Sequence, residues 1–292
     1  MSAKYACLAQ YRAEFPLRLM CRVLGVSHAG FYAARHRPPS ARARANAVLD
    51  VQLQAAHAAS DGTYGAPRLQ RALRGDGTRV SQKRIARRLR ALGLRGHRPR
   101  AWVRTTTPDA TLATAPNTLA RDFAVTAPDR VWSADITYLP THEGFLYLAV
   151  VLDVGSRRVV GWAMRPTLEE GLVLAALKAA LTTRRGRPVL HHSDQGSQYS
   201  GRAYRARLAA HGIACSMSRT GNCWDNAITE SFFATLKVES LTRRPCRTHA
   251  DARARVLHFI EAWYNPTRLH SSLGYRSPDT YEQDYWRQHA AT

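Results

Sequence analysis

Val131–Leu139 reads VWSADITYL, a strand-forming run with one acidic side chain, Asp135, inside it. In an extended strand successive side chains point to opposite faces, so Ser133, Asp135 and Thr137 share one face and the apolar residues share the other. A carboxylate in the middle of a core strand is costly unless a cation pairs with it. The stretch therefore predicts a core strand with a cation-binding acid.

The rest of the C-terminal half predicts an α/β domain around this strand. The expected elements are strands at 131–139, 145–153 and 157–164, a helix at 167–182, a strand at 188–192, a helix at 202–211, a strand at 213–217 and helices at 225–241 and 248–264. Three antiparallel strands followed by alternating helices and strands predict a mixed sheet flanked by helices. This is the element order of the ribonuclease-H-like fold.

The N-terminal third predicts helices only. A helix near 15–24 and a second one capped by Ser27 meet at Gly25, a spacing that fits a helix-turn-helix but also any helical hairpin. Further helices are expected at 41–59, 68–73 and 81–92. We therefore divide the chain into a helical, helix-turn-helix-like DNA-binding region at 1–95, a linker at 96–125 and a catalytic core at 126–288.

The chain is strongly basic, with 43 Lys and Arg against 21 Asp and Glu and a net charge of +22. Residues 1–130 carry 23 basic and 7 acidic side chains, whereas residues 131–292 are nearly balanced. An arginine-rich codon usage explains the excess of Arg over Lys, but it does not explain this asymmetry. The charge predicts a polyanionic partner that is held by the N-terminal half while the other half carries the chemistry.

The expected helix at 81–92 concentrates the positive charge. Its apolar residues, at helical spacing, define a buried face. A run of charge is usually only a solvated helix face, but five positive and no negative residues within eight positions favour contact with the phosphates of double-stranded DNA. The candidate DNA-binding residues on this helix are Lys83, Arg84, Arg87 and Arg88.

Two further acids have contexts as specific as that of Asp135. Asp194 ends the run PVLHHSD and opens a turn at the carboxyl end of an expected strand, where ligands bind in open sheets. Glu230 lies on the expected helix 225–241, whose apolar residues turn another face towards the core. Each acid alone would be read as a helix cap or an ion-pair partner, but the combination of Asp135, Asp194 and Glu230 predicts one catalytic site.

Carboxylate ligands without Cys or His suit Mg²⁺ or Mn²⁺. Phosphoryl transfer on DNA needs an activated nucleophile and a stabilised leaving oxyanion, and two metal ions about 3.5–4 Å apart supply both. We therefore expect two ions per active site. Asp135 is the candidate bridging ligand, and Asp194 and Glu230 are each expected to complete one ion.

Other polar residues carry weaker predictions. Lys237 lies about 10 Å beyond Glu230 on the same helical stripe. Asp153 ends a strand and is expected to be a turn or hydrogen-bonding residue, although it could lie near the site. His191 and His192 precede Asp194, and packing is the expected role for both.

The cysteines and the hydropathy predict an ordinary intracellular protein. The five Cys form no CxxC pair and no Cys/His spacing suited to zinc. There is no run of about 18 apolar residues and no N-terminal signal segment. The expectations are a cytoplasmic location and no membrane partner.

Several motifs resemble those of a known family. They are VWSADITY at 131–138, HSDQGSQY at 192–199, GNCWDNA at 221–227, ESFF at 230–233, WYN at 263–265 and RLH at 268–270, with MCRVLGVS at 20–27 and TYG at 63–65 upstream. From about Tyr5 to Glu282, nearly the whole chain, the sequence resembles the second-reading-frame transposases of bacterial insertion sequences of the IS-three type.

The resemblance implies a retroviral-integrase-like core with Asp135, Asp194 and Glu230 as its catalytic triad and Lys237 as a basic residue that contacts DNA near the active site. It implies metal-dependent cleavage and strand transfer at the ends of the element. Chemistry on paired ends suggests a homo-oligomer assembled on DNA. Since the family often joins this chain to the product of an upstream reading frame, that product is a candidate partner.

Two other functions fit part of the sequence. A non-catalytic DNA-binding regulator would use the helical region and retain a relict core, but the complete triad and Lys237 favour the enzyme. A ribonuclease H would share the core chemistry, but it would not need the long basic N-terminal half.

Overall fold

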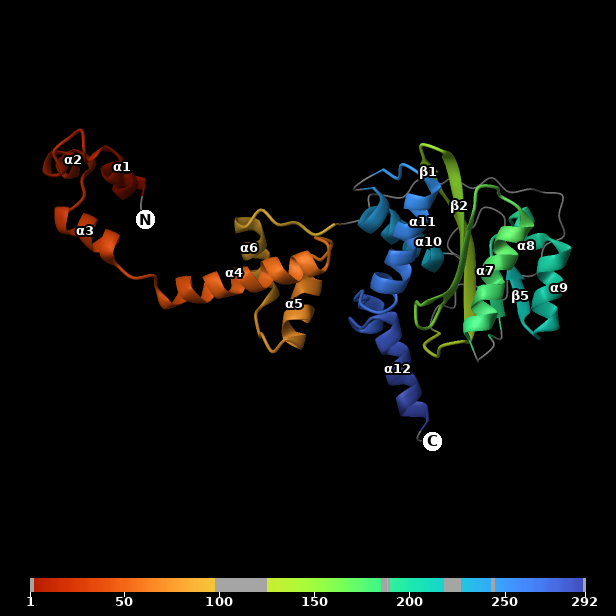
Figure 1. The fold of residues 1–292 in the computed structure, drawn as a ribbon. Coiled ribbons are helices and arrows are strands. Elements are labelled where there is room, and N and C mark those ends of the chain that lie inside the picture. Colours follow the sequence, from red (N-terminus) through yellow and green to blue (C-terminus); the bar gives the residue numbers. More distant parts are fainter. Residues whose placement is uncertain are drawn as a thin grey trace.

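The computed structural model describes residues 3–97, 125–184, 188, 190–217, 227–242 and 245–290. Figure 1 shows helical units built from the N-terminal third of the chain and an α/β core built from the rest. The expected linker at 96–125 lies almost entirely outside the described residues. Within the described ranges, every helix is too short or too polar to span a lipid bilayer.

A mixed sheet forms the centre of the core, as the sequence predicts. Its strands are β1 Val131–Thr141, β2 Gly144–Asp153, β3 Val159–Arg165, β4 Leu190–Ser193 and β5 Ala214–Met217. Their order across the sheet is β3-β2-β1-β4-β5. The first three strands pair antiparallel, and β4 runs parallel to both β1 and β5. This topology confirms the ribonuclease-H-like fold.

The third strand begins two residues later than predicted. Arg157 has a φ of 62°, a left-handed conformation that a strand does not use. The side chain of Asp153 fixes this turn, because its Oδ1 accepts hydrogen bonds from the Ser156 amide at 2.7 Å and the Ser156 hydroxyl at 2.8 Å. The prediction that Asp153 is a turn residue is confirmed.

Alternation along the strands determines which helices cover each face of the sheet (Figure 1). Trp132 and Ala134 of β1 are buried in a cluster with the first group of helices, while Leu139 and Leu148 are buried in a cluster with the second. The first group is α7 Glu170–Thr183, α8 Ser197–Ser200 and α9 Arg202–Ala210; the second is α10 Ala227–Leu236, α11 His249–Leu257 and η3 His258–Tyr264. By the same alternation Asp135 faces the α10 side.

Two of the expected helices change their winding before they end. The helix that starts as α10 continues as a π-helix, η2 Lys237–Leu241, and α11 continues as the π-helix η3. The sequence predicts two uninterrupted helices here. A π-turn is rare and often occurs at functional sites, because its wider winding redirects the side chains that follow.

Two small helical units precede the core. The first contains α1 Ala3–Tyr11, α2 Leu17–Leu24 and α3 His28–His36, and the second contains α4 Ala41–Ala59, α5 Ala66–Gly75 and α6 Gln82–Ala91. Gly25 ends α2 with a φ of 60°, and the Ser27 hydroxyl caps α3 by accepting from the Gly30 amide at 2.9 Å. Both features agree with the predicted helical hairpin.

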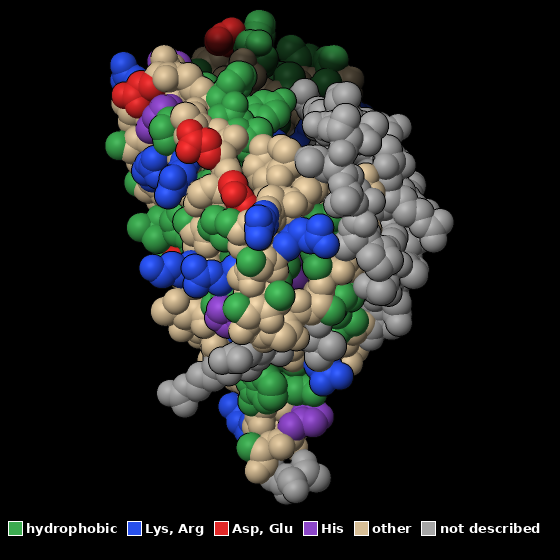
Figure 2. All heavy atoms as spheres, turned by 90° about the vertical axis from the view of Figure 1, so that its right-hand side faces the viewer, with side chains coloured by type: hydrophobic (Ala, Val, Ile, Leu, Met, Phe, Trp, Pro, Cys, Tyr) green, Lys and Arg blue, Asp and Glu red, His purple; other side chains and the backbone are tan. Residues whose placement is uncertain are grey.

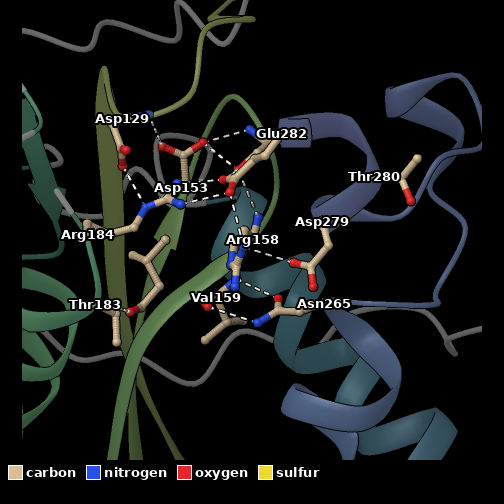
Figure 3. Close-up of polar contacts among 12 residues, drawn as sticks. Asp129, Asp153, Arg158, Val159, Thr183, Arg184, Asn265, Asp279, Thr280 and Glu282 are labelled. Carbon is tan, nitrogen blue, oxygen red and sulfur yellow. Dashed lines mark hydrogen bonds and ion pairs between the residues drawn. The ribbon is translucent and has the colours of Figure 1, made fainter. Parts of the chain in front are cut away.

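The last helix, α12 Pro278–His289, has no counterpart among the predicted elements. Figure 3 shows how its Glu282 enters an ion-pair cluster at the ends of β2 and α7. Arg184 donates to both Glu282 oxygens, at 2.7 and 2.5 Å, and its Nε donates to Asp129 Oδ1 at 2.9 Å. The Ser156 hydroxyl oxygen also lies 2.6 Å from Glu282 Oε1, so its one proton is shared between Asp153 and Glu282. Buried charge, rather than an apolar stripe, therefore attaches α12.

Gly161 marks a close approach of β3 to α7. A Cβ at this position would lie 2.4 Å from the Ala176 carbonyl oxygen and 2.5 Å from the Ala180 nitrogen. We expect Gly161→Ala to lower the free energy of unfolding by about 1–3 kcal/mol, because backbone must move to admit the methyl group. Gly75→Ala, which meets nothing within 4 Å, is the control and should be neutral or stabilising. Urea unfolding of both variants measures the contrast, and equal effects would contradict the packing argument.

Candidate active site

Strand register brings Asp135 and Asp194 to the same end of two adjacent strands. Ser133 of β1 pairs in parallel with His192 of β4, and each acid lies two residues beyond its member of that pair. Both side chains are partly buried. A backbone amide fixes each carboxylate: Asp135 Oδ1 accepts from Ile136 at 2.7 Å and Asp194 Oδ1 accepts from Gly196 at 3.0 Å.

Glu230 approaches this site from α10. The neighbouring Thr229 is buried, and its hydroxyl donates to the Ser133 hydroxyl at 2.7 Å. Since Ser133 and Asp135 share one face of β1, this bond fixes the start of α10 across the acid-bearing face. Glu230 follows Thr229 directly and is partly buried.

The electrostatics link the three acids to one another. Burial raises the pKa of Asp135 well above its usual value, and the charges of Asp194 and Glu230 raise it further, while the Ile136 amide and Lys237 oppose the shift. Burial also raises the pKa values of Asp194 and Glu230. The site thus holds more negative charge than its surroundings offset, so a bound cation would stabilise it.

The described side chains do not form a complete set of ligands for a metal ion. Among the described residues, no three His, Cys, Asp or Glu side chains lie close enough together to hold a metal ion. Asp135 and Asp194 are neighbours by register, whereas Glu230 is linked to them through α10 and through its effect on the pKa of Asp135. Residues 218–226, which precede α10, are not described.

Lys237 lies beside the same site. Its Nζ is 5.3 Å from the centre of the Tyr138 ring, and Tyr138 packs edge to face against Phe145 at 5.2 Å. Burial lowers the pKa of Lys237, while the charge of Asp135 opposes that shift. Tyr138 and Phe145 are 46% and 54% exposed, and neither is among the residues predicted for the site. Their positions on β1 and β2, the first of which carries Asp135, were the only sequence feature that could have indicated a place near the site.

The basic helix α6 divides into two sets of side chains. Arg84 donates to Asn46 Oδ1 at 3.3 and 2.8 Å, and Arg88 makes a two-bond pair with Asp50 at 2.7 and 2.6 Å. Both arginines therefore join α6 to α4. Lys83 and Arg87 are exposed one turn apart. The predicted phosphate contacts consequently rest on the exposed set more than on Arg84 and Arg88.

The two histidines before Asp194 are packing residues, as expected. Both are completely buried. A ring nitrogen of His191 lies 2.8 Å from the Tyr204 hydroxyl, and one of His192 lies 3.0 Å from the Ser216 hydroxyl. Burial lowers the pKa of His191 to about 3, which keeps that ring uncharged.

Comparison with protein families gives three matches along this chain. Two models described as integrase core domain match residues 125–223 and 211–278, and a model described as HTH-like domain matches residues 43–102. The first two cover the sheet and the three candidate acids. The third covers most of α4, all of α5 and α6, and the residues that follow α6.

Relatives align with nearly the whole chain. The transposase InsF for insertion sequence IS3A of Escherichia coli strain K12 is 40% identical over 282 residues, which cover 96% of this chain and 98% of the relative. The 31 kDa protein of insertion element IS600 from Shigella sonnei is 41% identical over 267 residues, covering 91% and 98%. Among solved structures, the HTLV-2 integrase catalytic core domain in complex with magnesium is 15% identical and covers 54% of this chain and 99% of its own, with a TM-score of 0.44.

Proposed function

This chain belongs to the transposases of IS3-type insertion sequences, and from that membership we propose that Asp135, Asp194 and Glu230 carry its DNA cleavage and strand-transfer chemistry. The observation that supports these three residues most directly is the β1–β4 register, with both aspartates two residues beyond the Ser133–His192 pair. The Thr229–Ser133 hydrogen bond, which fixes α10 over the same face, supports the inclusion of Glu230.

The donor chemistry of the three acids fits a divalent metal ion, although the described side chains do not come close enough together to hold one in this structure. Their donors are carboxylate oxygens, which suit Mg²⁺ and Mn²⁺, and the repulsion that raises the pKa of Asp135 is the kind of charge imbalance that a cation relieves. Asp135, Asp194 and Glu230 would hold two ions per active site, with Asp135 as the shared ligand. When bound, the metal activates the attacking oxygen and stabilises the leaving oxyanion.

The protein side chains have separate tasks in this proposal. Asp135 and Asp194, held by backbone amides, keep a fixed separation across two strands. The ammonium group of Lys237, beside Tyr138, would bind a phosphate oxygen of the DNA. In cleavage, an oxygen from water forms a new P–O bond while the P–O3′ bond breaks and frees a 3′-hydroxyl. In strand transfer, that hydroxyl forms a P–O bond with a target phosphodiester, and the 3′ oxygen of the target strand leaves as a hydroxyl.

The direct test uses labelled double-stranded DNA that carries the ends of the element. The purified protein is incubated with this DNA and Mg²⁺ or Mn²⁺, beside an Asp194→Asn variant. Metal-dependent nicking or joining that disappears in the variant is the expected result. If the wild type binds but neither cuts nor joins, with or without the upstream reading-frame product, the regulator is the correct function and the proposed catalytic roles fail.

The remaining assignments extend this proposal. We divide the chain into a DNA-binding region at 1–95, a linker at 96–125 and the catalytic core at 126–288. The partners are the ends of the element and its target DNA, a second copy of the chain assembled on that DNA, and the upstream reading-frame product, all within the cytoplasm. Figure 2 faces the α7–α9 end of the core, where Asp and Glu side chains lie among the Lys and Arg side chains, in keeping with the nearly balanced charge of residues 131–292.

The two sets of side chains on α6 predict different effects on DNA binding. Lys83→Met and Arg87→Met should each weaken binding across all sequences and reduce the slope of log Kd against log salt by about one, because each variant removes one phosphate contact. Arg88→Met should leave that slope nearly unchanged, since Arg88 is paired with Asp50. Fluorescence anisotropy at several salt concentrations measures the slopes. An equal decrease in all three variants would mean that the whole face contacts phosphate.

A further inference from the structure

A buried carboxylate lies on the same continuous helix as Glu230 and Lys237. Glu239 is 6% exposed and belongs to η2, which continues α10 without a break. Arg268, which is 5% exposed, donates to its two oxygens through Nε at 2.8 Å and Nη2 at 2.7 Å. The indole of Trp263 donates to the same carboxylate at 3.4 Å. The core thus holds this helix by a two-bond ion pair.

The helical unit that contains α5 supplies a second cation to the same carboxylate. Arg68 Nη1 lies 3.7 Å from Glu239 Oε1, and its Nε donates to the Leu269 carbonyl at 3.0 Å. The hydroxyl of Tyr64, two residues before α5, accepts from the Leu269 amide at 2.8 Å, and the centre of its ring lies 5.5 Å from that of Trp263. The contact between the helical unit and the core therefore includes the helix that carries Glu230.

Different faces of the α10–η2 helix carry the candidate site residues and the buried ion pair. At about 100° per residue along α10, Lys237 returns to within about 20° of Glu230. The face with Glu230 and Lys237 is turned towards β1, because the Thr229 hydroxyl donates to Ser133 at 2.7 Å and Lys237 Nζ lies 5.3 Å from the centre of the Tyr138 ring.

Glu239 follows two residues after Lys237 in the π-helical η2 and turns to a different side of the helix, where Arg268 and Arg68 contact it. Any movement of the helical unit at Arg68 would therefore act on the helix that carries Glu230 and Lys237.

We propose that Arg68 is a positioning residue, which acts through Glu239 to hold the α10–η2 helix, with Glu230 and Lys237, against the site of Asp135. The proposal rests on the proposed function, because it assigns Glu230 to the catalytic set. It makes the docked helical unit part of the active-site framework as well as a DNA-binding element.

The first test separates turnover from binding in the full-length protein. In Arg68→Met, we expect kcat for cleavage of element-end DNA to fall about tenfold to a hundredfold, because small misplacements of catalytic groups have effects of this size. KM and Kd for the same DNA should stay within about twofold, and Arg68→Lys should restore part of kcat since it retains the charge. Arg74→Met is the control: it removes an exposed arginine of the same helix that has no ion-pair partner among the described residues.

Three results would overturn the proposal. They are an unchanged kcat in Arg68→Met, a loss of kcat that Arg74→Met shares, and a weakened Kd with kcat intact, which would make Arg68 a DNA contact.

The second test asks whether Arg68 acts through Glu239. In a Glu239→Gln background, adding Arg68→Met should lower kcat no further, because two residues on one path are not additive. An equal loss in both backgrounds overturns the path through Glu239.

A third measurement does not depend on enzymatic activity, and it does not require that the Glu239 variant folds. Hydrogen exchange of residues 227–241 should be faster in Arg68→Met than in the wild type and unchanged in Arg74→Met. If the wild type fails to cut DNA but this difference is present, the proposed function fails while the mechanical link stands. If exchange is unchanged, the link itself is absent.

Discussion

Asp135→Asn should reduce cleavage and strand transfer by at least about a thousandfold, since removing one member of a catalytic set that acts as a unit has effects of this order. In the proposed site Asp135 is central, because strand register places it beside Asp194 and the charges of Asp194, Glu230 and Lys237 all act on its pKa. Asn keeps the shape of the side chain and can still accept a hydrogen bond from the Ile136 amide. The loss would therefore report the missing charge rather than a lost fold. Gel analysis of labelled DNA ends in the presence of Mn²⁺ measures it.

The same substitution should stabilise the metal-free protein. Burial and two neighbouring carboxylates oppose the charged form of Asp135, so its removal should raise Tm by about 2–4 °C, which corresponds to roughly 1 kcal/mol for a domain of this size. An active site that loses stability in order to hold reactive charge is a common compromise. Asp76→Asn, at an exposed site beyond α5, should change neither activity nor Tm.

The sign of the pH dependence follows from the raised pKa of Asp135. A carboxyl whose pKa is higher in the folded than in the unfolded chain binds its proton more tightly when folded. The stability that it contributes is fully present below the unfolded pKa and is lost as the pH rises through the folded pKa. Tm should thus fall less steeply with rising pH in Asp135→Asn, and added Mg²⁺ should raise Tm in the wild type alone. A variant that is no more stable than the wild type above the folded pKa would contradict the assigned charge repulsion.

Arg184→Met should cause the largest loss of stability in the core, about 3 kcal/mol, because it removes the cation that Asp129 and the buried Glu282 share. Glu282 keeps a second cation, since Nη1 of the 34% exposed Arg158 lies 3.2 Å from its Oε2. The Arg184 and Glu282 side chains are only 11% and 5% exposed, and Arg184 also pairs with Asp129 (Figure 3). Although burial opposes it, the hydrogen bonds from Arg184 keep the pKa of Glu282 below its usual value. Removal of Arg184 should therefore weaken the attachment of α12, which Arg158 still holds through Asp279 and Glu282.

The matched control is Arg287→Met on the same helix. Arg287 is 76% exposed and pairs with Asp284 on the surface, so its loss should change the unfolding free energy by less than about 1 kcal/mol. Urea unfolding followed by tryptophan fluorescence compares the two variants, and limited proteolysis reports whether α12 detaches. Equal stability of the two variants would mean that α12 is held by contacts other than this ion pair.

Much of the fold could be predicted from the sequence, because its signals are local. Alternation identified β1, β2 and β3, and turn residues separated them. The helix α12 had no such signal, since its buried residues are only Pro278 and Glu282. The π-helical segments were equally invisible, because a change of one residue in hydrogen-bond register leaves no mark in the hydrophobic pattern.

For the candidate site too, the local features could be predicted from the sequence and the long-range contacts could not. Its acids were chosen from their local contexts, but the parallel register that makes Asp135 and Asp194 neighbours joins residues almost 60 positions apart. The partners of Arg84 and Arg88 lie on α4, so a positive stripe on α6 could not show that two of its members were already paired. Glu239 was missed because its cations come from two distant parts of the chain. Sequence pattern identifies side chains, whereas long-range pairing decides what they do.

The docking of α5 also limits how this enzyme can be rebuilt. Tyr64 and Arg68 hold Leu269, and Trp263 and Leu269 pack into the hydrophobic cluster of α4–α6. A chimaera that replaced residues up to 97 with a foreign DNA-binding domain would expose these two apolar side chains to water. A variant designed to recognise a different DNA sequence should therefore carry its substitutions on the outward face of α6 and keep α5 unchanged. The helical unit is not an interchangeable module.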